Sequence, residues 1–158
     1  MKHPDYNSPA ELKQVLDING FSMQKKFGQN FLINSEARKK LIDTLQVDEN
    51  TSVWEVGPGL GAMTSEILER NAELTVFEID RGFASLISNY FEDFAKKDKF
   101  FLVEGDVLKT WKTHLEKTKI PDRFFGNLPY NIAATIIADT IENNVRFDRC
   151  VFTVQKEV

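Results

Sequence analysis

The chain has 158 residues, of which 42% are hydrophobic, and 13 of them are phenylalanine. This length supports one domain with a substantial core, and this composition excludes a disordered chain. The net charge of -4 is unfavourable for binding nucleic-acid phosphates, although the stretch 22–41 is locally basic. No run approaches the roughly 18 apolar residues of a membrane span, and the N-terminus carries no apolar signal region, so we expect a cytoplasmic protein without membrane contact.

The first predicted element is a short helix after Ser8, which opens a Ser-Pro-Ala-Glu capping box with proline at the first helical position. We therefore interpret residues 1–21 as an N-terminal helical extension and residues 22–158 as the main domain. A second helix is expected to start at Asn34 or Ser35, since either side chain can cap it.

From residue 51 onward, strand-like and helix-like patterns alternate. Strands are expected at 51–57, 73–79, 99–105, 122–127 and 146–155, and helices at 63–71, 83–94 and 132–144. The stretch 107–120 fits either a short helix or two turns. Such alternation predicts an α/β fold in which a doubly wound, mostly parallel sheet is covered by helices. Because the chain stops three residues after the fifth strand, we expect a sheet truncated at that point.

A glycine-rich turn, residues 57–61, follows the first predicted strand. Gly57 and Gly59 allow a tight turn and the close approach of a ligand to the backbone. Glu78 ends the second strand, where an acid can bind both ribose hydroxyls of an adenosine ligand. Asp106 follows the third strand and could accept a hydrogen bond from an adenine amino group, or equally cap the next helix. The alternative for the whole turn is a structural role without a ligand.

A dinucleotide is a competing ligand, since Gly57, Gly59 and Ala62 also satisfy the dinucleotide-binding fingerprint. Three features argue against an NAD-dependent oxidoreductase. Pro58 removes a backbone donor that a pyrophosphate would use, and a helix precedes the first strand of the sheet. The fourth strand also ends in Asn-Leu-Pro-Tyr, which hydride transfer does not need.

The tetrapeptide 127–130, Asn-Leu-Pro-Tyr, follows the fourth predicted strand. The exocyclic nitrogen of adenine is a poor nucleophile because its lone pair is delocalised, and two hydrogen-bond acceptors would favour a tetrahedral, reactive nitrogen. The Asn127 side-chain oxygen and the Leu128 carbonyl can be these acceptors, with Pro129 holding Leu128 extended. Tyr130 offers a face on which the base can stack, worth about 1–3 kcal/mol. Alternatively, Asn127 caps the following helix and Tyr130 only packs.

The single cysteine and the two histidines are not expected to take part in catalysis or metal binding. Cys150 lies in an apolar run, so we expect a buried and inert thiol. His3 and His114 have no ligand-like spacing, so no metal site is expected.

In combination, these motifs resemble the KsgA-type rRNA adenine dimethyltransferases over about residues 22–158. The matching segments are Lys25-Lys26-Phe27-Gly28-Gln29-Asn30-Phe31-Leu32, the segment 55–61 that contains the glycine turn, Glu78, Gly105-Asp106 and the tetrapeptide 127–130. The resemblance implies a Rossmann-like class I methyltransferase that uses S-adenosyl-L-methionine. It also implies transfer of two methyl groups to the N6 amine of each of two adjacent adenosines near the 3′ end of small-subunit rRNA. The enzyme would act as a monomer on the immature small ribosomal subunit during ribosome biogenesis.

The resemblance also assigns roles to individual residues. The implied cofactor-binding residues are Gln29, Asn30, Leu32, Gly57, Gly59, Glu78, Asp106 and Asn127. The implied catalytic residues are Asn127, Leu128, Pro129 and Tyr130. Ala133 and Ala134 depart from the Ser-Thr pair that is usual in the family. The family also has two further strands and a helical C-terminal domain that helps to bind RNA, so we expect this chain alone to hold the cofactor weakly and to methylate poorly.

Two other functions remain open from the sequence. Erm-type enzymes, which methylate an adenine of large-subunit rRNA, share most of these motifs, but Lys-Phe-Gly before Gln29 and the leucine at 128 favour the KsgA type. A non-catalytic role in ribosome assembly or RNA binding is the second alternative. The intact tetrapeptide 127–130 and Glu78 favour retained catalysis.

Overall fold

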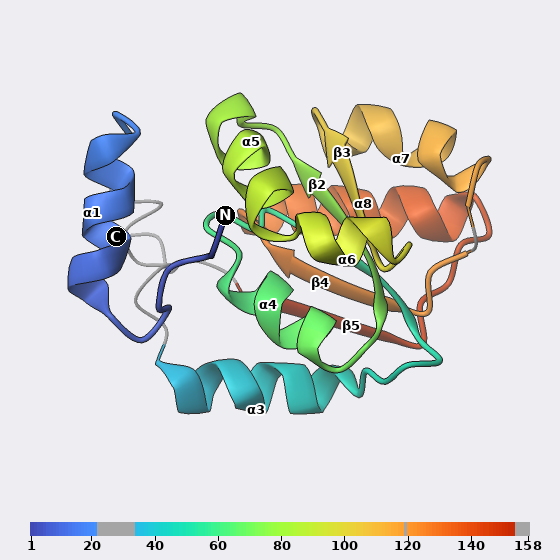
Figure 1. Ribbon diagram of the computed structural model, residues 1–158. Coiled ribbons are helices and arrows are strands. Elements are labelled where there is room, and N and C mark those ends of the chain that lie inside the picture. The colour runs from blue at the N-terminus through green and yellow to red at the C-terminus, as the bar shows by residue number, and fades with distance from the viewer. Residues whose placement is uncertain (22–33, 119, 154–158) are drawn as a thin grey trace.

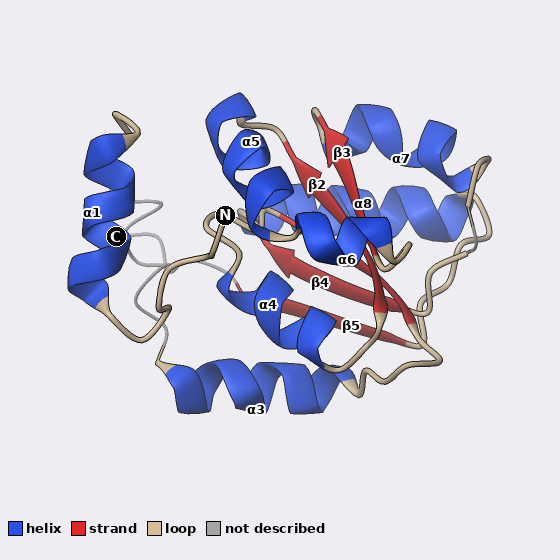
Figure 2. Cartoon of the chain, viewed as in Figure 1, coloured by secondary structure: helices blue, strands red, loops and turns tan. Residues whose placement is uncertain are grey.

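A computed structural model describes residues 1–21, 34–118 and 120–153 of the chain. The elements in chain order are α1 (Pro9–Ile18), α3 (Ser35–Leu45), β1 (Ser52–Val56), α4 (Ala62–Glu69), β2 (Glu73–Glu78), α5 (Arg81–Tyr90), α6 (Glu92–Lys96), β3 (Phe100–Glu104), α7 (Val107–Leu115), β4 (Arg123–Asn127), α8 (Tyr130–Glu142) and β5 (Arg149–Thr153) (Figure 1). The strands form one parallel sheet in the order β3-β2-β1-β4-β5, with helices on both faces (Figure 2). The predicted α/β architecture is therefore confirmed. No helix within the described ranges has both the length and the apolar character needed to cross a bilayer.

Side-chain caps set the starts of the first two helices. The Ser8 hydroxyl accepts a hydrogen bond from the Glu11 N–H at 3.2 Å, and the Asn34 side-chain oxygen accepts one from the Ala37 N–H at 2.8 Å. Each bond satisfies an N–H group that the first turn of a helix leaves without a backbone partner. Between the two predicted caps of the second helix, the structure therefore selects Asn34 over Ser35.

The helices differ from the expectation in two places. The single helix expected at 83–94 forms two, α5 and α6, divided at Phe91, and α8 begins at Tyr130, two residues before the predicted start. Of the two alternatives for 107–120, the described residues form the short helix, α7. Pro129 precedes α8, and its carbonyl accepts the N–H groups of Ile132 and Ala133, both at 3.1 Å. Proline suits this place because an N–H at the start of a helix would lack a backbone partner in any case. Tyr130 is consequently held in the first turn of α8, directly after β4.

The sheet separates two apolar cores, and alternation along each strand sends successive side chains to opposite faces. In β1, for example, Val53 packs with α3, α4 and α5, whereas Trp54 packs with α7 and α8. Figure 1 shows these two groups of helices on the two sides of the sheet. β1, β2 and β4 are buried on both faces, and each accordingly contains neighbouring apolar residues, such as Val53 and Trp54 in β1 or Phe124 and Phe125 in β4.

The prediction of a buried thiol at Cys150 is wrong, because its side chain is exposed. Cys150 lies in β5, the outermost strand of the described sheet, and pairs with Phe124 of β4 on one side only. An edge strand has a neighbouring strand on one side alone, so an apolar run in it does not ensure burial of every residue.

The two-core arrangement predicts very different effects for the same substitution in two helices. Ile67 of α4 is fully buried, whereas Ile141 of α8 is 53% exposed. Ile67→Ala should leave a cavity and lower the free energy of unfolding by about 2–5 kcal/mol. Ile141→Ala should change it by no more than about 0.5 kcal/mol. Urea denaturation followed by circular dichroism measures both, and equal losses would contradict the arrangement.

Candidate functional site

The predicted site residues that the structure describes meet at the carboxyl edge of the sheet. The chain winds outward from β1 through β2 to β3, then returns across the sheet to β4 on the other side of β1. In open α/β sheets, ligands bind outside the carboxyl ends of the strands at the point where the winding reverses. The glycine turn 57–61 after β1 and the tetrapeptide 127–130 after β4 lie on the two sides of this point (Figure 1).

The glycine turn lies directly against the end of β4. Gly57, Gly59 and Gly61 have φ angles of 74°, 58° and 92°, which other residues rarely adopt. A Cβ atom at Gly57 would also lie 2.8 Å from the carbonyl oxygen of Asn127, a distance that real Cβ atoms essentially never show. Backbone conformation and close packing therefore both require glycine at position 57, and the turn is in contact with the end of β4.

Glu78 lies at the end of β2 with its side chain buried beside the turn. Burial raises the pKa of its carboxyl from 4.5 to about 7, and the N–H groups of Asp80, Gly59 and Ile79 oppose this rise by favouring the charged form. The bond from the Asp80 N–H to the carboxylate measures 3.2 Å. Glu78 is therefore a hydrogen-bond acceptor next to Gly59 with little exposure to water. Hydroxyl groups of a ligand that donate to this carboxyl would favour its ionised form.

Asp106 is the N-terminal cap of α7. One oxygen of its carboxylate accepts the Leu108 N–H at 3.0 Å, which confirms the capping alternative. The preceding residue, Gly105, donates its N–H to the Glu78 carbonyl at 2.8 Å and so places Asp106 at the same sheet edge as Glu78. The adenine contact predicted for Asp106 stays a prediction.

The Asn127 side chain bonds to β5 and does not cap α8. Its oxygen accepts the Thr153 hydroxyl at 2.8 Å, and these two residues are direct partners in the pairing of β4 with β5. Among the described residues, no side chain caps α8 by a hydrogen bond, so the capping alternative for Asn127 is contradicted. The bond orients the amide and leaves its oxygen one lone pair for a further donor. Sequence patterns could not identify Thr153, because they do not give the register between β4 and β5.

The other members of the tetrapeptide lie on the surface side of Asn127. Leu128 is half-buried and packs partly against the core under α7 and α8, whereas Pro129 is exposed. Tyr130 is 65% exposed, so its ring can stack with a base without displacing core residues. The predicted cofactor residues Gln29, Asn30 and Leu32 lie outside the described residues.

A second buried carboxyl, Glu55, lies in β1 below the turn. It is 1% exposed and accepts the Thr64 hydroxyl of α4 at 2.6 Å. Burial raises its pKa from 4.5 to about 8, the Thr64 bond opposes this rise, and the charge of Glu78 adds to it. Sequence reasoning treated Glu55 only as part of the glycine motif. The available signal was a single acid among the apolar residues Val53, Trp54 and Val56 of the same strand.

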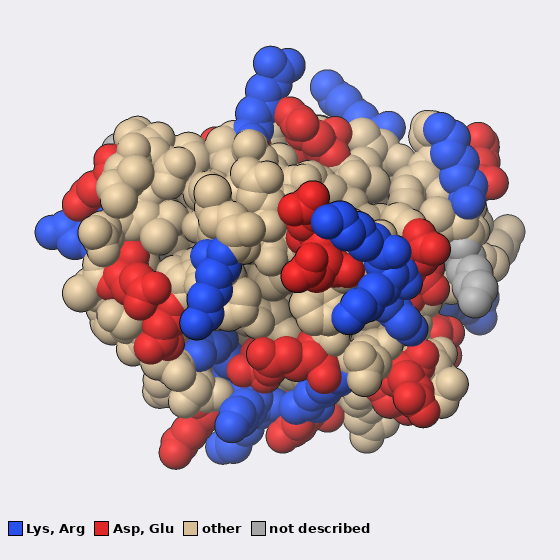
Figure 3. Space-filling model, viewed as in Figure 1, with Lys and Arg blue, Asp and Glu red and all other residues tan. Residues whose placement is uncertain are grey.

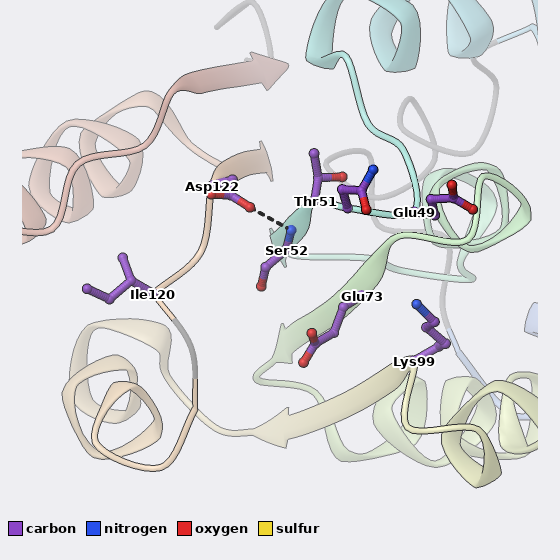
Figure 4. A pocket seen from close by; sticks show the side chains of 8 residues that line it. Glu49, Thr51, Ser52, Glu73, Lys99, Ile120 and Asp122 are labelled. Carbon is purple, nitrogen blue, oxygen red and sulfur yellow. Dashed lines mark hydrogen bonds between the residues drawn. The ribbon is translucent and has the colours of Figure 1, made fainter.

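A polar hollow of about 370 Å³ lies at the opposite, amino edge of the sheet (Figure 4). It is lined by Glu49, Asn50, Thr51, Ser52, Glu73, Lys99, Ile120 and Asp122. The Asp122 carboxylate accepts the Ser52 N–H at 3.0 Å and the Asp122 N–H donates to the Ser52 carbonyl at 2.8 Å, which joins the starts of β1 and β4. These two hydrogen bonds stabilise the sheet, and the hollow lies at the edge remote from the candidate site.

The strand order, the glycine turn after β1 and the acid ending β2 define a Rossmann-like fold of the methyltransferase class. A dimethyladenosine transferase from Plasmodium falciparum has this fold with a TM-score of 0.61 at 24% identity, over 78% of this chain and 42% of that one. The 23S rRNA methyltransferase ErmE has a TM-score of 0.58 at 22% identity, over 78% of this chain and 47% of that one.

The chain belongs to the ribosomal RNA adenine dimethylase family, whose family model matches residues 20–158. The ribosomal RNA small subunit methyltransferase A of Treponema denticola is 56% identical to it over 98% of this chain and 52% of that protein. The chain thus spans about half the length of the curated relatives it matches. These findings confirm the family resemblance seen in the motifs.

The buried proton on Glu55 should make the stability of the fold depend on pH. The carboxyl ionises near 4.5 when unfolded but near 8 in the fold. Between these values the unfolded chain binds fewer protons, so the free energy of unfolding falls as the pH rises. Glu55→Gln keeps an acceptor for Thr64 without a titrating proton, so it should make the profile less steep between about pH 5 and pH 8. The slope that remains below about pH 7 belongs to Glu78, whose pKa is also raised.

Urea denaturation at a series of pH values measures this slope. The control is Glu69→Gln, which changes an exposed acid of α4 and should leave the profile unchanged. A Glu55→Gln profile as steep as that of the wild type would show that Glu55 does not hold the proton.

Proposed function

We propose that this chain forms the cofactor-binding and catalytic part of an S-adenosyl-L-methionine-dependent rRNA adenine dimethyltransferase. Its substrate would be the N6 amine of two adjacent adenosines near the 3′ end of small-subunit rRNA. The contact between the glycine turn and the Asn127 carbonyl carries the proposal, because methyl donor and target amine have to meet in line. Membership of the adenine dimethylase family and the identity to a small-subunit methyltransferase support the same substrate class.

The residues at the sheet edge fit the proposed cofactor. A side chain at Gly57 would fill the space between the turn and β4, and its absence allows close approach to the backbone. Glu78 would accept the ribose hydroxyls, and Asp106 would accept the adenine amino group through its oxygen that does not cap α7. The cofactor supplies an electrophilic methyl group on a positively charged sulfonium, and the chain's task is to orient it.

The target adenine would enter from the side of α8. Tyr130 would stack on the base after it leaves its RNA helix or loop. Asn127, already oriented by Thr153, would accept one N–H of the amine, and the Leu128 carbonyl would accept the other. These bonds would direct the nitrogen lone pair away from the ring towards the turn. Such alignment can lower a barrier by about 7–11 kcal/mol without a covalent intermediate.

Affinity for RNA is proposed to be low in these 158 residues alone. On the face shown in Figure 3, lysines and arginines are interspersed with acidic side chains, and the whole chain carries a net charge of -4. Phosphate binding depends on clustered positive charge, which this face does not offer. We therefore expect slow methylation by the isolated chain and faster methylation by a protein of the relatives' length that carries the same residues.

Asn127→Ala should abolish most methyl transfer, because one of the two acceptors for the amine is lost. We expect kcat to fall by about 10²–10³-fold, the usual effect of removing one positioned hydrogen-bond group from a reacting centre. The measurement is transfer of radiolabelled methyl groups to unmethylated small subunits by the longer protein. Asn131→Ala, which changes an exposed residue one position beyond Tyr130, is the matched control and should retain activity.

The same assay separates the alternatives. Undiminished methylation by the Asn127→Ala protein would refute the catalytic assignment. Transfer to large subunits in place of small ones would favour the Erm-type function. Binding of small subunits without any transfer by the wild type would favour an assembly factor.

Ligand binding at Glu78 should release a proton near neutral pH. Hydroxyl donors favour the ionised carboxylate, so binding should lower its pKa from about 7. Methylthioadenosine is the suitable probe, since it presents the adenosine hydroxyls without an amino-acid group that titrates in this range. Its affinity should rise from about pH 6 to pH 8, and its binding enthalpy at pH 7 should depend on the ionisation enthalpy of the buffer.

Isothermal titration calorimetry in two buffers tests this expectation. Glu78→Gln should bind the probe more weakly and lose the dependence on the buffer. The same enthalpy in both buffers for the wild type would exclude proton release from Glu78.

A further inference from the structure

The N-terminal segment contacts the glycine turn itself, although the family match begins only at residue 20. The hydroxyl of Tyr6 donates a buried hydrogen bond of 2.7 Å to the carbonyl of Leu60. Leu60 lies within the turn, between Gly59 and Gly61, and is itself buried. The two bonded residues are 54 positions apart in the chain, so the bond is a long-range contact between the N-terminal segment and the turn.

Contacts on both sides of Tyr6 hold this segment in place. The buried Arg38 side chain of α3 donates to the Tyr6 carbonyl at 3.4 Å and to the Asn7 side-chain oxygen at 2.5 Å. The ring of His3 stacks on that of Tyr6, with 4.9 Å between centroids. After Asn7, α1 continues the attachment in a small apolar cluster. Its buried members are Tyr6, Leu12, Leu16, Leu60, Phe83 and Leu86.

The turn needs such support because its own residues determine its shape only weakly. Three of its five residues are glycines with positive φ, and glycine has more alternative conformations to lose than any other residue. The Tyr6 hydroxyl also lies 3.1 Å from the position that a Cβ of Gly61 would take, so it fits closely against the backbone. Burial raises the pKa of Tyr6 far above its usual range, which keeps the hydroxyl protonated as a donor.

We propose that residues 3–7 form a strap that holds the glycine turn in the shape its ligand requires, with Tyr6 as the positioning residue. The identity of that ligand, an S-adenosyl compound, rests on the function proposed above, whereas the restraint on the turn does not. Without the Tyr6 bond the turn would occupy the required shape for only part of the time. The apparent affinity would then fall in proportion to that fraction.

Tyr6→Phe tests the strap, because it removes the hydroxyl and keeps the ring that stacks with His3. The control is Tyr90→Phe, which removes a hydroxyl from the rim of the same apolar cluster without breaking a hydrogen bond to any described residue. Calorimetry with S-adenosylhomocysteine should show binding about 3- to 10-fold weaker for Tyr6→Phe, and unchanged for Tyr90→Phe. Amide hydrogen exchange without ligand should accelerate by a similar factor at residues 59–62 and remain unchanged in β2 and β3.

Equal affinity of Tyr6→Phe and wild type would overturn the positioning role. Exchange that accelerates uniformly over the whole domain would also overturn it, since that result indicates general stabilisation only. If the wild type binds no S-adenosylhomocysteine, the proposed function fails and the exchange measurement alone decides whether the strap restrains the turn. If Tyr6→Phe does not fold, Asn7→Ala replaces it, because it loosens the strap at its bond to Arg38 and should change affinity and exchange in the same direction.

Discussion

The close contact between Gly57 and the Asn127 carbonyl is the constraint on which the rest of the site depends. It exists only because β1 and β4, separated by two strands and their helices in the sequence, are neighbours in a parallel sheet. A side chain at position 57 would force the two strand ends apart and separate the glycine turn from the tetrapeptide. The long crossover from β3 back to β4 therefore has a direct chemical consequence, since it places two otherwise unrelated motifs within contact distance.

The site also concentrates carboxyl groups that have lost most of their hydration. Glu55 and Glu78 both have raised pKa values, and desolvation is the largest cause in each case. Two such groups near one turn reduce the stability of the fold at neutral pH, because keeping either of them charged inside the protein is unfavourable. Functional sites commonly contain groups that lower the stability of the fold but are needed for binding. A positively charged ligand near these carboxylates would offset part of the cost of their burial.

Sequence patterns predicted the architecture well because it depends on local information. Alternating apolar runs located each strand to within a few residues, and Ser8 and Asn34 marked helix starts through bonds that span only three residues. The contacts that complete the site are of a different kind. Thr153 reaches Asn127 across a strand pair, and Tyr6 reaches Leu60 across 54 positions. Register and long-range packing decide such contacts, and neither leaves a local pattern. Cys150 illustrates the same limit, since its apolar neighbours gave no sign that β5 lies at the edge.

The exposure of Cys150 makes the molecule accessible to site-specific labelling. It is the only cysteine of the chain, so a thiol-reactive dye would attach at one known place without prior mutagenesis. That place lies on β5, three residues before the threonine whose hydroxyl orients Asn127. A fluorophore there would sit next to the strand pair that supports the tetrapeptide and outside both apolar cores. The exposed position of Cys150 on the edge strand, which made the prediction of burial wrong, thus provides an attachment point for a probe. Such a probe would report conformational changes at the end of β4 in solution.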